Sequence, residues 1–370
     1  GGVINLVTKS GGNRFKASLD YRYAGDNFQT SGEHWDPDEQ PTNSSDLNAS
    51  LGGPILRDRL WFFTALQSFN EDYTPPAAPT TRQWSEQNYL GKLTWQASGA
   101  WSLVGKVITN PIEWDYSGSN QFRAPEATWL ESWDVISGQA GVSGVLSDSL
   151  FLGARVSGME SSFEYFPQDG DFTTIGHFNL DSREAYGNVV SQNFDERSRM
   201  EIDTDVSWFV DDLVGSHDVK GGIKLTDSGY LANRCYMGGG RPCTGGDEGF
   251  FFQDLLGEQG QNIPLRMWAN EIANNQTFDG SIWSAFLQDS WRIRDRLNLN
   301  LGVRWEGQYL DGSDGELAVS ISDQWQPRAG FIYQLDDGGD QQLFGSYGRF
   351  YQELSMDGPA AFFIYGATYR

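Results

Sequence analysis

The feature of this sequence that most constrains its fold is an unbroken alternation of apolar and polar residues. In residues 297–306, Leu297, Leu299, Leu301, Val303 and Trp305 alternate with Asn298, Asn300, Gly302, Arg304 and Glu306. Successive side chains of a β-strand point to opposite faces, so this stretch predicts a strand with one apolar and one polar face. A slip of one residue would invert both faces, which means that the pattern also fixes the register of the strand.

The same alternation marks about thirteen segments and predicts an all-β chain. The segments are 15–23, 46–54, 60–69, 87–96, 101–109, 133–146, 150–160, 200–210, 218–227, 282–293, 297–306, 324–335 and 342–351. No segment shows the 3.6-residue periodicity of an amphipathic helix.

The connections between these segments alternate between short and long. Short polar links occupy 56–59, 97–100, 147–149, 294–296 and 336–340, and long loops occupy 24–45, 70–86, 110–132, 161–198 and 228–281. A β-sandwich gives no reason for every second connection to be long, whereas an outer-membrane barrel has short periplasmic turns and long external loops. The expected fold is therefore an antiparallel transmembrane β-barrel.

Aromatic residues near the predicted strand ends point to the same architecture. They are Tyr21, Tyr23, Trp95, Trp101, Trp208, Trp291, Trp305 and Trp325. Such residues form girdles at the two membrane interfaces, with the rings in lipid and the polar tips among headgroups. The apolar residues 297, 299, 301, 303 and 305 are then expected to face lipid, and Asn298, Asn300, Arg304 and Glu306 to face the concave side.

Composition argues against a nucleic-acid partner and against a transmembrane helix, and it is compatible with a membrane β-barrel. The chain carries 50 Asp and Glu against 26 Lys and Arg, a net charge of -24, which argues against nucleic acid as a partner. No run of 18 apolar residues occurs, so a transmembrane helix is excluded. A barrel strand needs only about 9 to 11 residues, half of them facing a polar lumen.

Cys235 and Cys243, the two cysteines of the chain, lie eight positions apart in a Gly-rich segment. They could close a small surface loop through a disulfide in an oxidising compartment, or remain two reduced thiols in a loop. No histidine lies near them, which argues against zinc.

Three stretches of the chain resemble the TonB-dependent receptor family. The opening GGVINLVTK, with Gly1, Gly2, Val3, Ile4 and Asn5, resembles the junction at which the plug domain leads into the barrel. SLGGPILRDRLWFFTALQSF (50–69) and SAFLQDSWRIRDRLNLNLGVRWEG (284–307) are similar to strand pairs of the Oar-like branch, whose members carry a carboxypeptidase-regulatory repeat.

The resemblance implies a barrel of about 22 strands around a plug. Residues 1–12 would be the C-terminal end of the plug domain and residues 13–370 a partial barrel holding about 13 strands. The signal peptide, the segment that contacts TonB and most of the plug would precede this sequence, and the remaining strands would follow it. Because lipid offers no water to the N–H and C=O groups of two open edges, this chain alone is not expected to form a stable pore.

No arrangement of residues suggests catalysis, so we expect neither enzyme activity nor a resident cofactor. His34, His177 and His217 are isolated in the sequence and lie in no nucleophile or metal motif. Calcium in external loops is one alternative, because hard cations bind clustered oxygens. The candidate ligands are Asp169 and Asp171 in one turn and Asp311, Asp314 and Glu316 in another, and their alternative role is that of solvated turn acids.

Two aromatic loop segments, FEYF (163–166) and FFF (250–252), could contact a ligand such as a carbohydrate or peptide, or could pack the loops on one another.

Charged residues on the polar faces of two adjacent segments are predicted to face the lumen. They are Glu201, Asp203 and Asp205 on one strand and Lys220 and Lys224 on the next, in addition to Arg304 and Glu306. Antiparallel partners share a face, so directly opposed residues must have numbers that sum to about 427 or 429, which sets Lys224 opposite Asp203 or Asp205. These residues would contact the plug, line the substrate path or pair across the wall.

The function implied by the resemblance is that of an outer-membrane receptor and transporter of Gram-negative bacteria. External loops would capture a siderophore, glycan, peptide or protein, and the TonB–ExbB–ExbD system would act on the plug to open a path. One alternative is a passive porin or surface adhesin, which would share the wall and lack the plug. A second is a soluble extracellular β-rich glycosidase that uses two of the many carboxylic acids.

Overall fold

A computed structural model gives the fold of the chain. It describes residues 7–28, 42–211, 213–238, 249–269, 274–294, 296–336, 341–354, 356 and 368–369. In this part of the chain the helical structure consists of two 3-10 turns, η1 (Asp26–Phe28) and η2 (Pro125–Ala127). Among the described residues, no helix has the length and apolar character needed to cross a membrane.

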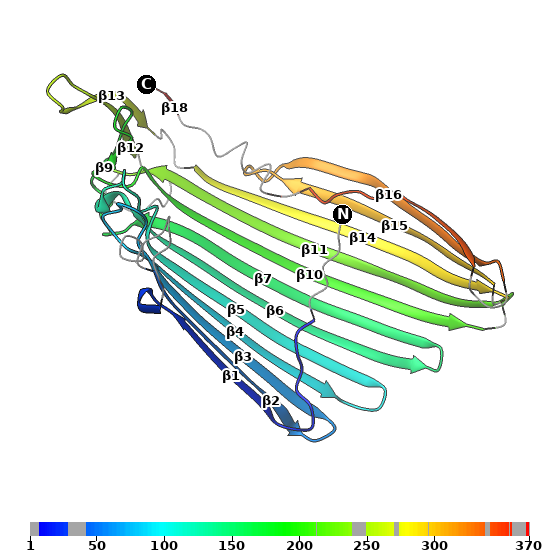
Figure 1. The fold of residues 1–370 in the computed structure, drawn as a ribbon. Helices are drawn as coiled ribbons and strands as arrows, with labels where there is room; N and C mark the ends of the chain where they lie inside the picture. The colour runs from blue at the N-terminus through cyan, green and yellow to red at the C-terminus, as the bar shows by residue number, and fades with distance from the viewer. Residues whose placement is uncertain are drawn as a thin grey trace.

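One antiparallel sheet of thirteen strands forms most of the molecule (Figure 1). Its strands, in spatial order, are β1 (Lys16–Ala24), β2 (Thr42–Leu56), β3 (Leu60–Tyr73), β4 (Arg82–Gln96), β5 (Trp101–Ser117), β6 (Trp129–Ser147), β7 (Leu150–Pro167), β10 (Ser191–Val210), β11 (Ser216–Tyr236), β14 (Asn274–Ile293), β15 (Leu297–Asp311), β16 (Leu317–Gln334) and β17 (Gln342–Gly348). We call this sheet the wall. Each of the thirteen predicted segments overlaps one of its strands, which confirms the all-β prediction.

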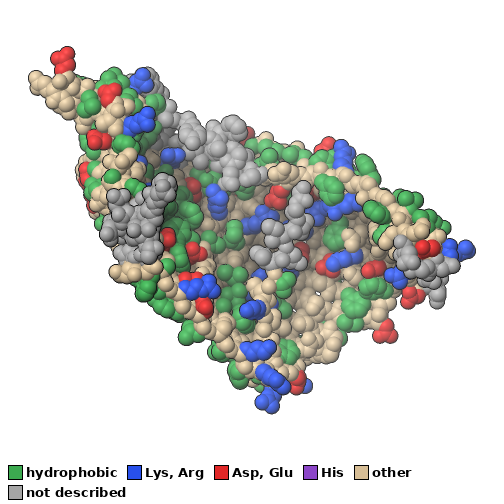
Figure 2. Space-filling view, in the orientation of Figure 1, with side chains coloured by type: hydrophobic (Ala, Val, Ile, Leu, Met, Phe, Trp, Pro, Cys, Tyr) green, Lys and Arg blue, Asp and Glu red, His purple; other side chains and the backbone are tan. Residues whose placement is uncertain are grey.

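The wall curves into an open trough whose two edges are β1 and β17 (Figures 1 and 2). No pairing among the described residues joins these two strands, so the trough is not closed. The short turns lie along one end of the strands, at the lower right of Figure 1, and the longer connections lie at the other end. We call these the turn end and the loop end.

The strands extend farther toward the loop end than the alternation predicted, so the predicted loops were too long. β10 has 20 residues and β11 has 21, which at about 3.3 Å per residue is roughly twice the 30 Å thickness of a bilayer core. Beyond the bilayer both faces of a strand meet water or other loops. The apolar and polar residues therefore stop alternating although the backbone pairing continues.

The two faces of the wall differ as the alternation predicts. On the face that carries residues 301 and 303, large apolar side chains are exposed. They include Leu93, Val107, Val156, Met200, Ile202, Ile223, Leu225, Trp283, Leu287, Leu301, Val303 and Trp325. Figure 2 shows Lys, Arg, Asp and Glu side chains on the concave face, inside the trough. An exposed apolar surface of this kind is what a membrane barrel presents to lipid.

A second, smaller sheet lies at the loop end of the wall, where only loops were predicted (Figure 1). We call it the loop sheet. Its order is β18 (Thr368–Tyr369), β13 (Asn262–Ala269), β12 (Phe250–Leu256), β8 (Gly176–Asn179) and β9 (Ala185–Tyr186). β12 and β8 pair in parallel although they are far apart in sequence, so no local pattern could predict this sheet.

Candidate functional site

The concave faces of β7, β10 and β11 carry a row of ion pairs. Lys224 Nζ lies 2.8 Å from Glu201 Oε2, Lys220 Nζ lies 3.0 Å from Asp205 Oδ2, and Arg155 Nε donates to Asp203 Oδ2 over 2.8 Å. Glu201 is the least exposed of these acids, and a second cation, Arg199, lies 3.5 Å from it. The five charges predicted on this pair of strands therefore share one face, and each has a partner of opposite charge.

The strand register has the first of the two predicted sums, 427, since Asp203 lies directly opposite Lys224. The two lysines, however, pair with diagonal neighbours, whereas Asp203 pairs with a residue directly opposite it. Lys224 reaches Glu201, two residues along β10, and Asp203 pairs with Arg155 of β7, which lies directly opposite it on the other side. A long lysine side chain can reach a diagonal neighbour across a strand pair, so register alone did not determine the partners.

Lys224→Glu is expected to lower the free energy of unfolding by about 0.5 to 1 kcal/mol, since it sets a carboxylate beside Glu201 in a hydrated trough. Urea titration of the bilayer-inserted full-length protein measures the change. Lys224→Gln, which removes the attraction without adding repulsion, should cost less. Equal stabilities of the two variants would show that the charge at position 224 has no electrostatic interaction with Glu201 that affects stability.

Arg304 and Glu306 pair with each other on β15. Arg304 Nη2 lies 2.8 Å from Glu306 Oε2 and also donates to Ser284 Oγ on the neighbouring strand over 3.0 Å. Glu306 and the nearby Gln308 are buried. Gln308 Oε1 accepts a hydrogen bond from the backbone N–H of Leu354, in the segment that follows β17.

This segment, residues 349–354 and Met356, crosses the concave face. The sequence pattern predicted its first residues to be the end of a strand and predicted no structure for the others. Glu353 pairs with Arg199 at 3.1 Å, and Met356 packs against the buried pair Tyr230 and Phe278. The prediction that the last strand continues to residue 351 was therefore wrong by three residues, since β17 ends at Gly348. The signal that could have shown this is the loss of alternation after Gly348.

A buried polar cluster holds the loop sheet together. Asp254 is fully buried, and its Oδ2 accepts hydrogen bonds from the Tyr186 hydroxyl and from His177 Nδ1, the latter over 2.9 Å. The His177 ring stacks between Tyr186 and Phe252, with ring centroids 5.0 and 5.2 Å away. Burial, and then the hydrogen bond to the Asp254 carboxylate, raise the pKa of Tyr186 above its usual range. The phenol therefore stays protonated and donates at neutral pH.

The aromatic loop segments pack on other aromatic side chains. Phe163 contacts Trp133 at a centroid distance of 5.2 Å, Phe166 contacts Phe172 at 6.0 Å, and Phe251 contacts Tyr236 at 6.0 Å. Such edge-to-face and tilted contacts stabilise the loop end of the wall. Packing of the loops was one of the two roles predicted from the sequence for these segments, and contact with a ligand was the other.

The acidic turns use their carboxylates within the turns themselves. Asp171 accepts hydrogen bonds from Thr173 and Thr174, which hold the pKa of its carboxyl well below the usual range. Asp169 Oδ1 accepts from the backbone N–H of residue 171, and Asp314 Oδ1 from that of Glu316. Among the described residues, no group of three or more His, Cys, Asp or Glu side chains could hold a metal ion.

Cys235 lies near the end of β11, buried, and its sulfur is part of a disulfide. Gln192 Nε2 donates to this sulfur over 3.3 Å. Cys243 lies outside the described residues, so the pairing of the two cysteines stays a prediction.

Alkylation tests this pairing. We expect neither cysteine of the unreduced, denatured protein to react with iodoacetamide, and both to react after reduction. The closed segment is short and follows a wall strand, so reduction should leave the stability of the wall unchanged. Two alkylated thiols before reduction would contradict the bond.

The junction residues Gly1, Gly2, Val3, Ile4 and Asn5 lie outside the described residues. The described part of the N-terminal segment lies against the concave face of the wall. Lys92 Nζ donates to both the carbonyl oxygen and the hydroxyl of Thr8, each over 3.1 Å. Near the turn end, Asn13 Oδ1 accepts from the backbone N–H of Asp58 and from Trp61 Nε1.

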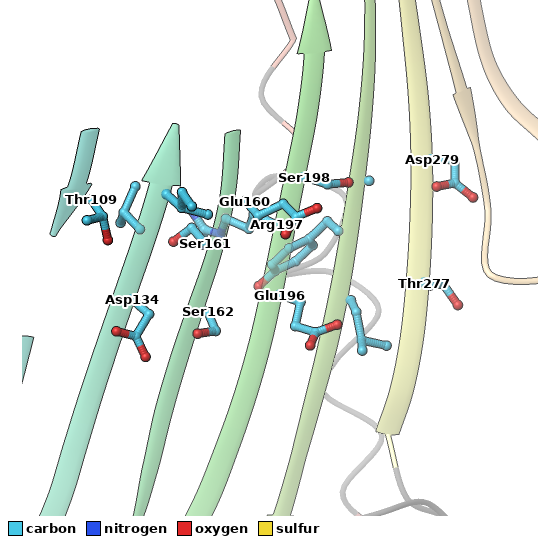
Figure 3. A pocket seen from close by; sticks show the side chains of 15 residues that line it. Thr109, Asp134, Glu160, Ser161, Ser162, Glu196, Arg197, Ser198, Thr277 and Asp279 are labelled. Carbon is cyan, nitrogen blue, oxygen red and sulfur yellow. The ribbon is translucent and has the colours of Figure 1, made fainter. Parts of the chain in front are cut away.

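Carboxylates on the outer face mark where the apolar surface ends. Asp134, Glu160, Glu196 and Asp279 line a hollow of about 560 Å³ that spans strands β5 to β14 (Figure 3). By register they share a face with Met200 and lie on its loop-end side. The exposed Asp227 lies directly opposite Met200 on this face. Because charged side chains are costly in a hydrocarbon core, the apolar band that could meet lipid ends at the level of Met200.

Comparison with known proteins agrees with this architecture. The family model described as "TonB dependent receptor-like, beta-barrel" matches residues 133–368. The chain is 23% identical over 458 residues to the TonB-dependent transporter Oar of Myxococcus xanthus, an alignment that covers 96% of this chain and 42% of that protein.

Solved structures share the fold. The outer-membrane transporter YddB of Escherichia coli matches with a TM-score of 0.67 at 14% identity, over 91% of this chain and 44% of that one. The siderophore receptor PirA of Acinetobacter baumannii matches with a TM-score of 0.56 at 13% identity, over 89% and 42%. The chain thus spans less than half the length of these relatives. Because the family model matches more than half of the chain, the chain belongs to the TonB-dependent receptor β-barrel family.

Proposed function

We propose that the chain forms part of the barrel of an energy-coupled outer-membrane receptor, which binds a ligand at the loop end and passes it through the lumen. The observation that carries the proposal is the wall itself. Its outer face exposes apolar side chains, and its concave face carries paired charges that suit a hydrated path. The membership of the family supports the coupling to TonB.

Residues 1–12 are proposed to be the end of the plug domain and residues 13–370 a part of the barrel. The contact of Thr8 with Lys92 supports this division, since it places the N-terminal segment inside the trough. In this arrangement the charged residues of β10 and β11 face the lumen, where they contact the plug or border the path.

The proposed partners are outer-membrane lipid, the TonB–ExbB–ExbD system and a ligand of one of four classes: siderophore, glycan, peptide or protein. Among the matched structures, PirA is described as a siderophore receptor, and FpvAI was solved in a complex with pyocin S2. These descriptions concern those proteins, and the likeness in fold does not select among the four classes. The proposed role requires no catalysis by this chain.

Fractionation of cells that produce the full-length protein tests its location. We expect the protein in the outer-membrane fraction, with detergent needed for its extraction. Recovery from the medium or from the soluble fraction without detergent would contradict the proposal and favour an extracellular glycosidase.

Energy coupling separates the transporter from a passive porin. Ser157 lies directly opposite Glu201 on the concave face, and Val156 is its neighbour on the apolar face. A maleimide dye is expected to label Ser157→Cys faster in cells with TonB than in cells without it, while the lipid-facing control Val156→Cys labels slowly in both. Equal labelling of Ser157→Cys in the two strains would contradict coupling.

A further inference from the structure

The concave face near the turn end of β1 to β5 concentrates positive charge. Lys9, Arg14 and Lys16 line a cavity of about 720 Å³ between the N-terminal segment and the wall. Lys92 and Lys106 lie directly opposite each other on the neighbouring strands β4 and β5. We call these five residues the cationic patch. Figure 2 shows Lys and Arg side chains gathered at the lower end of the trough, where these strands turn.

The patch is continuous across the wall. Phe63 lines the cavity and is the direct register partner of Lys92. Lys92 in turn binds Thr8, the residue that precedes Lys9. The two lysines and the cavity therefore border one region.

The patch differs from the concave face of β7, β10 and β11 because its cations lack carboxylate partners. On β7, β10 and β11 each of Arg155, Lys220 and Lys224 forms an ion pair. Within the described ranges, none of the five patch residues forms an ion pair with an acid. Such a group of unpaired cations is unexpected in a chain of net charge -24, in which acidic residues outnumber basic residues almost two to one.

Like charges directly opposite each other on paired strands are destabilising. Lys92 and Lys106 form such a pair, and the field of the other three cations adds to the repulsion. A negatively charged group in the cavity would offset the repulsion among Lys9, Arg14 and Lys16, which line it, and its field would lower the repulsion between the two lysines that border it. The arrangement is therefore more stable with an anion than without one.

We propose that the cationic patch binds a small solute with two or more carboxylate or phosphate groups. The cavity volume lies within the range of small-molecule sites, about 300 to 1,000 Å³. Arg14 offers a planar fork that suits either oxyanion, and the lysines supply point charges around it. Ser10, Ser18 and Ser50 also line the cavity and offer hydroxyl groups.

This inference names a ligand class for the lumen and so rests on the proposed function. Titration calorimetry of the detergent-solubilised full-length protein with inorganic pyrophosphate, at constant ionic strength, tests it. We expect saturable binding that Arg14→Gln/Lys16→Gln weakens about tenfold or more, as the loss of charge-assisted hydrogen bonds requires. The matched control is Arg57→Gln/Arg59→Gln, which removes two exposed charges from a turn at the same end of the wall, and it should bind as the unmodified protein does.

A charge-preserving variant guards against a folding defect. Arg14→Lys/Lys16→Arg keeps both charges and one guanidinium group in the cavity, and it should bind more tightly than Arg14→Gln/Lys16→Gln. Absence of pyrophosphate binding to the unmodified protein, or equal weakening in the two Gln variants, would overturn the inference. Equilibrium binding needs no energy coupling, so these outcomes leave the proposed transport function intact, whereas failure to insert into the outer membrane would overturn that function instead.

Discussion

Replacing Val303 with arginine is expected to destabilise the bilayer-inserted protein by about 2 to 4 kcal/mol, because the new charge must enter the hydrocarbon core. Val303 lies between Leu301 and Trp305 on the apolar face of β15, and 39% of its surface is exposed there. Its direct cross-strand partners, Leu287 and Pro327, carry no carboxylate, and the diagonal Asp289 already pairs with His217. Urea titration of the full-length protein in phospholipid vesicles measures the change.

The matched control is Asn300→Arg on the same strand. Asn300 belongs to the concave face, where its side chain accepts a hydrogen bond from Ser290 over 2.6 Å. In a hydrated trough the added charge should cost less than about 1 kcal/mol. Equal costs at the two positions would show that β15 does not separate lipid from water.

Replacing Asp254 with alanine is expected to destabilise the loop sheet by about 2 to 3 kcal/mol, since hydrogen bonds to a charged group are lost. Asp254 is fully buried and is the common acceptor for Tyr186 and His177. The substitution leaves both donors without their partner. Hydrogen–deuterium exchange should accelerate in β8 and β12, while exchange in the wall strands stays unchanged.

Glu258→Ala is the control for this prediction, because Glu258 is exposed in the turn between β12 and β13. It removes the same charge from the same loop sheet and should leave exchange unaltered. Unchanged exchange in Asp254→Ala would show that the buried cluster does not hold the sheet together.

The wall could be predicted from sequence because its two faces meet different solvents. In the proposed barrel, lipid on one side and water on the other impose the alternation of β15 from Leu297 to Trp305, and the register follows from it. The same logic limited the residue opposite Lys224 to Asp203 or Asp205, and the structure has Asp203 there. Outside the bilayer this constraint vanishes, which is why the extensions of β10 and β11 were read as loops.

The polar cluster of the loop sheet could not be predicted for a different reason. His177 and Asp254 are 77 residues apart and meet through the parallel pairing of β8 with β12. Nothing local to either residue marks this contact, so His177 was interpreted as an isolated histidine. The ion pair of Lys224 with its diagonal neighbour Glu201 likewise depends on the length of the lysine side chain, and the strand register alone does not predict it.

The central claim is that the two faces of the wall meet lipid and water in a membrane. Spin labels placed one at a time at positions 297 to 305 of the full-length protein in bilayers, with oxygen and a water-soluble nickel complex as relaxing agents, test it most directly. The account predicts a period of two, with labels at odd positions relaxed by oxygen and labels at even positions relaxed by nickel. Nickel accessibility at Val303 equal to that at Arg304, or accessibility with no alternation along the strand, would contradict it.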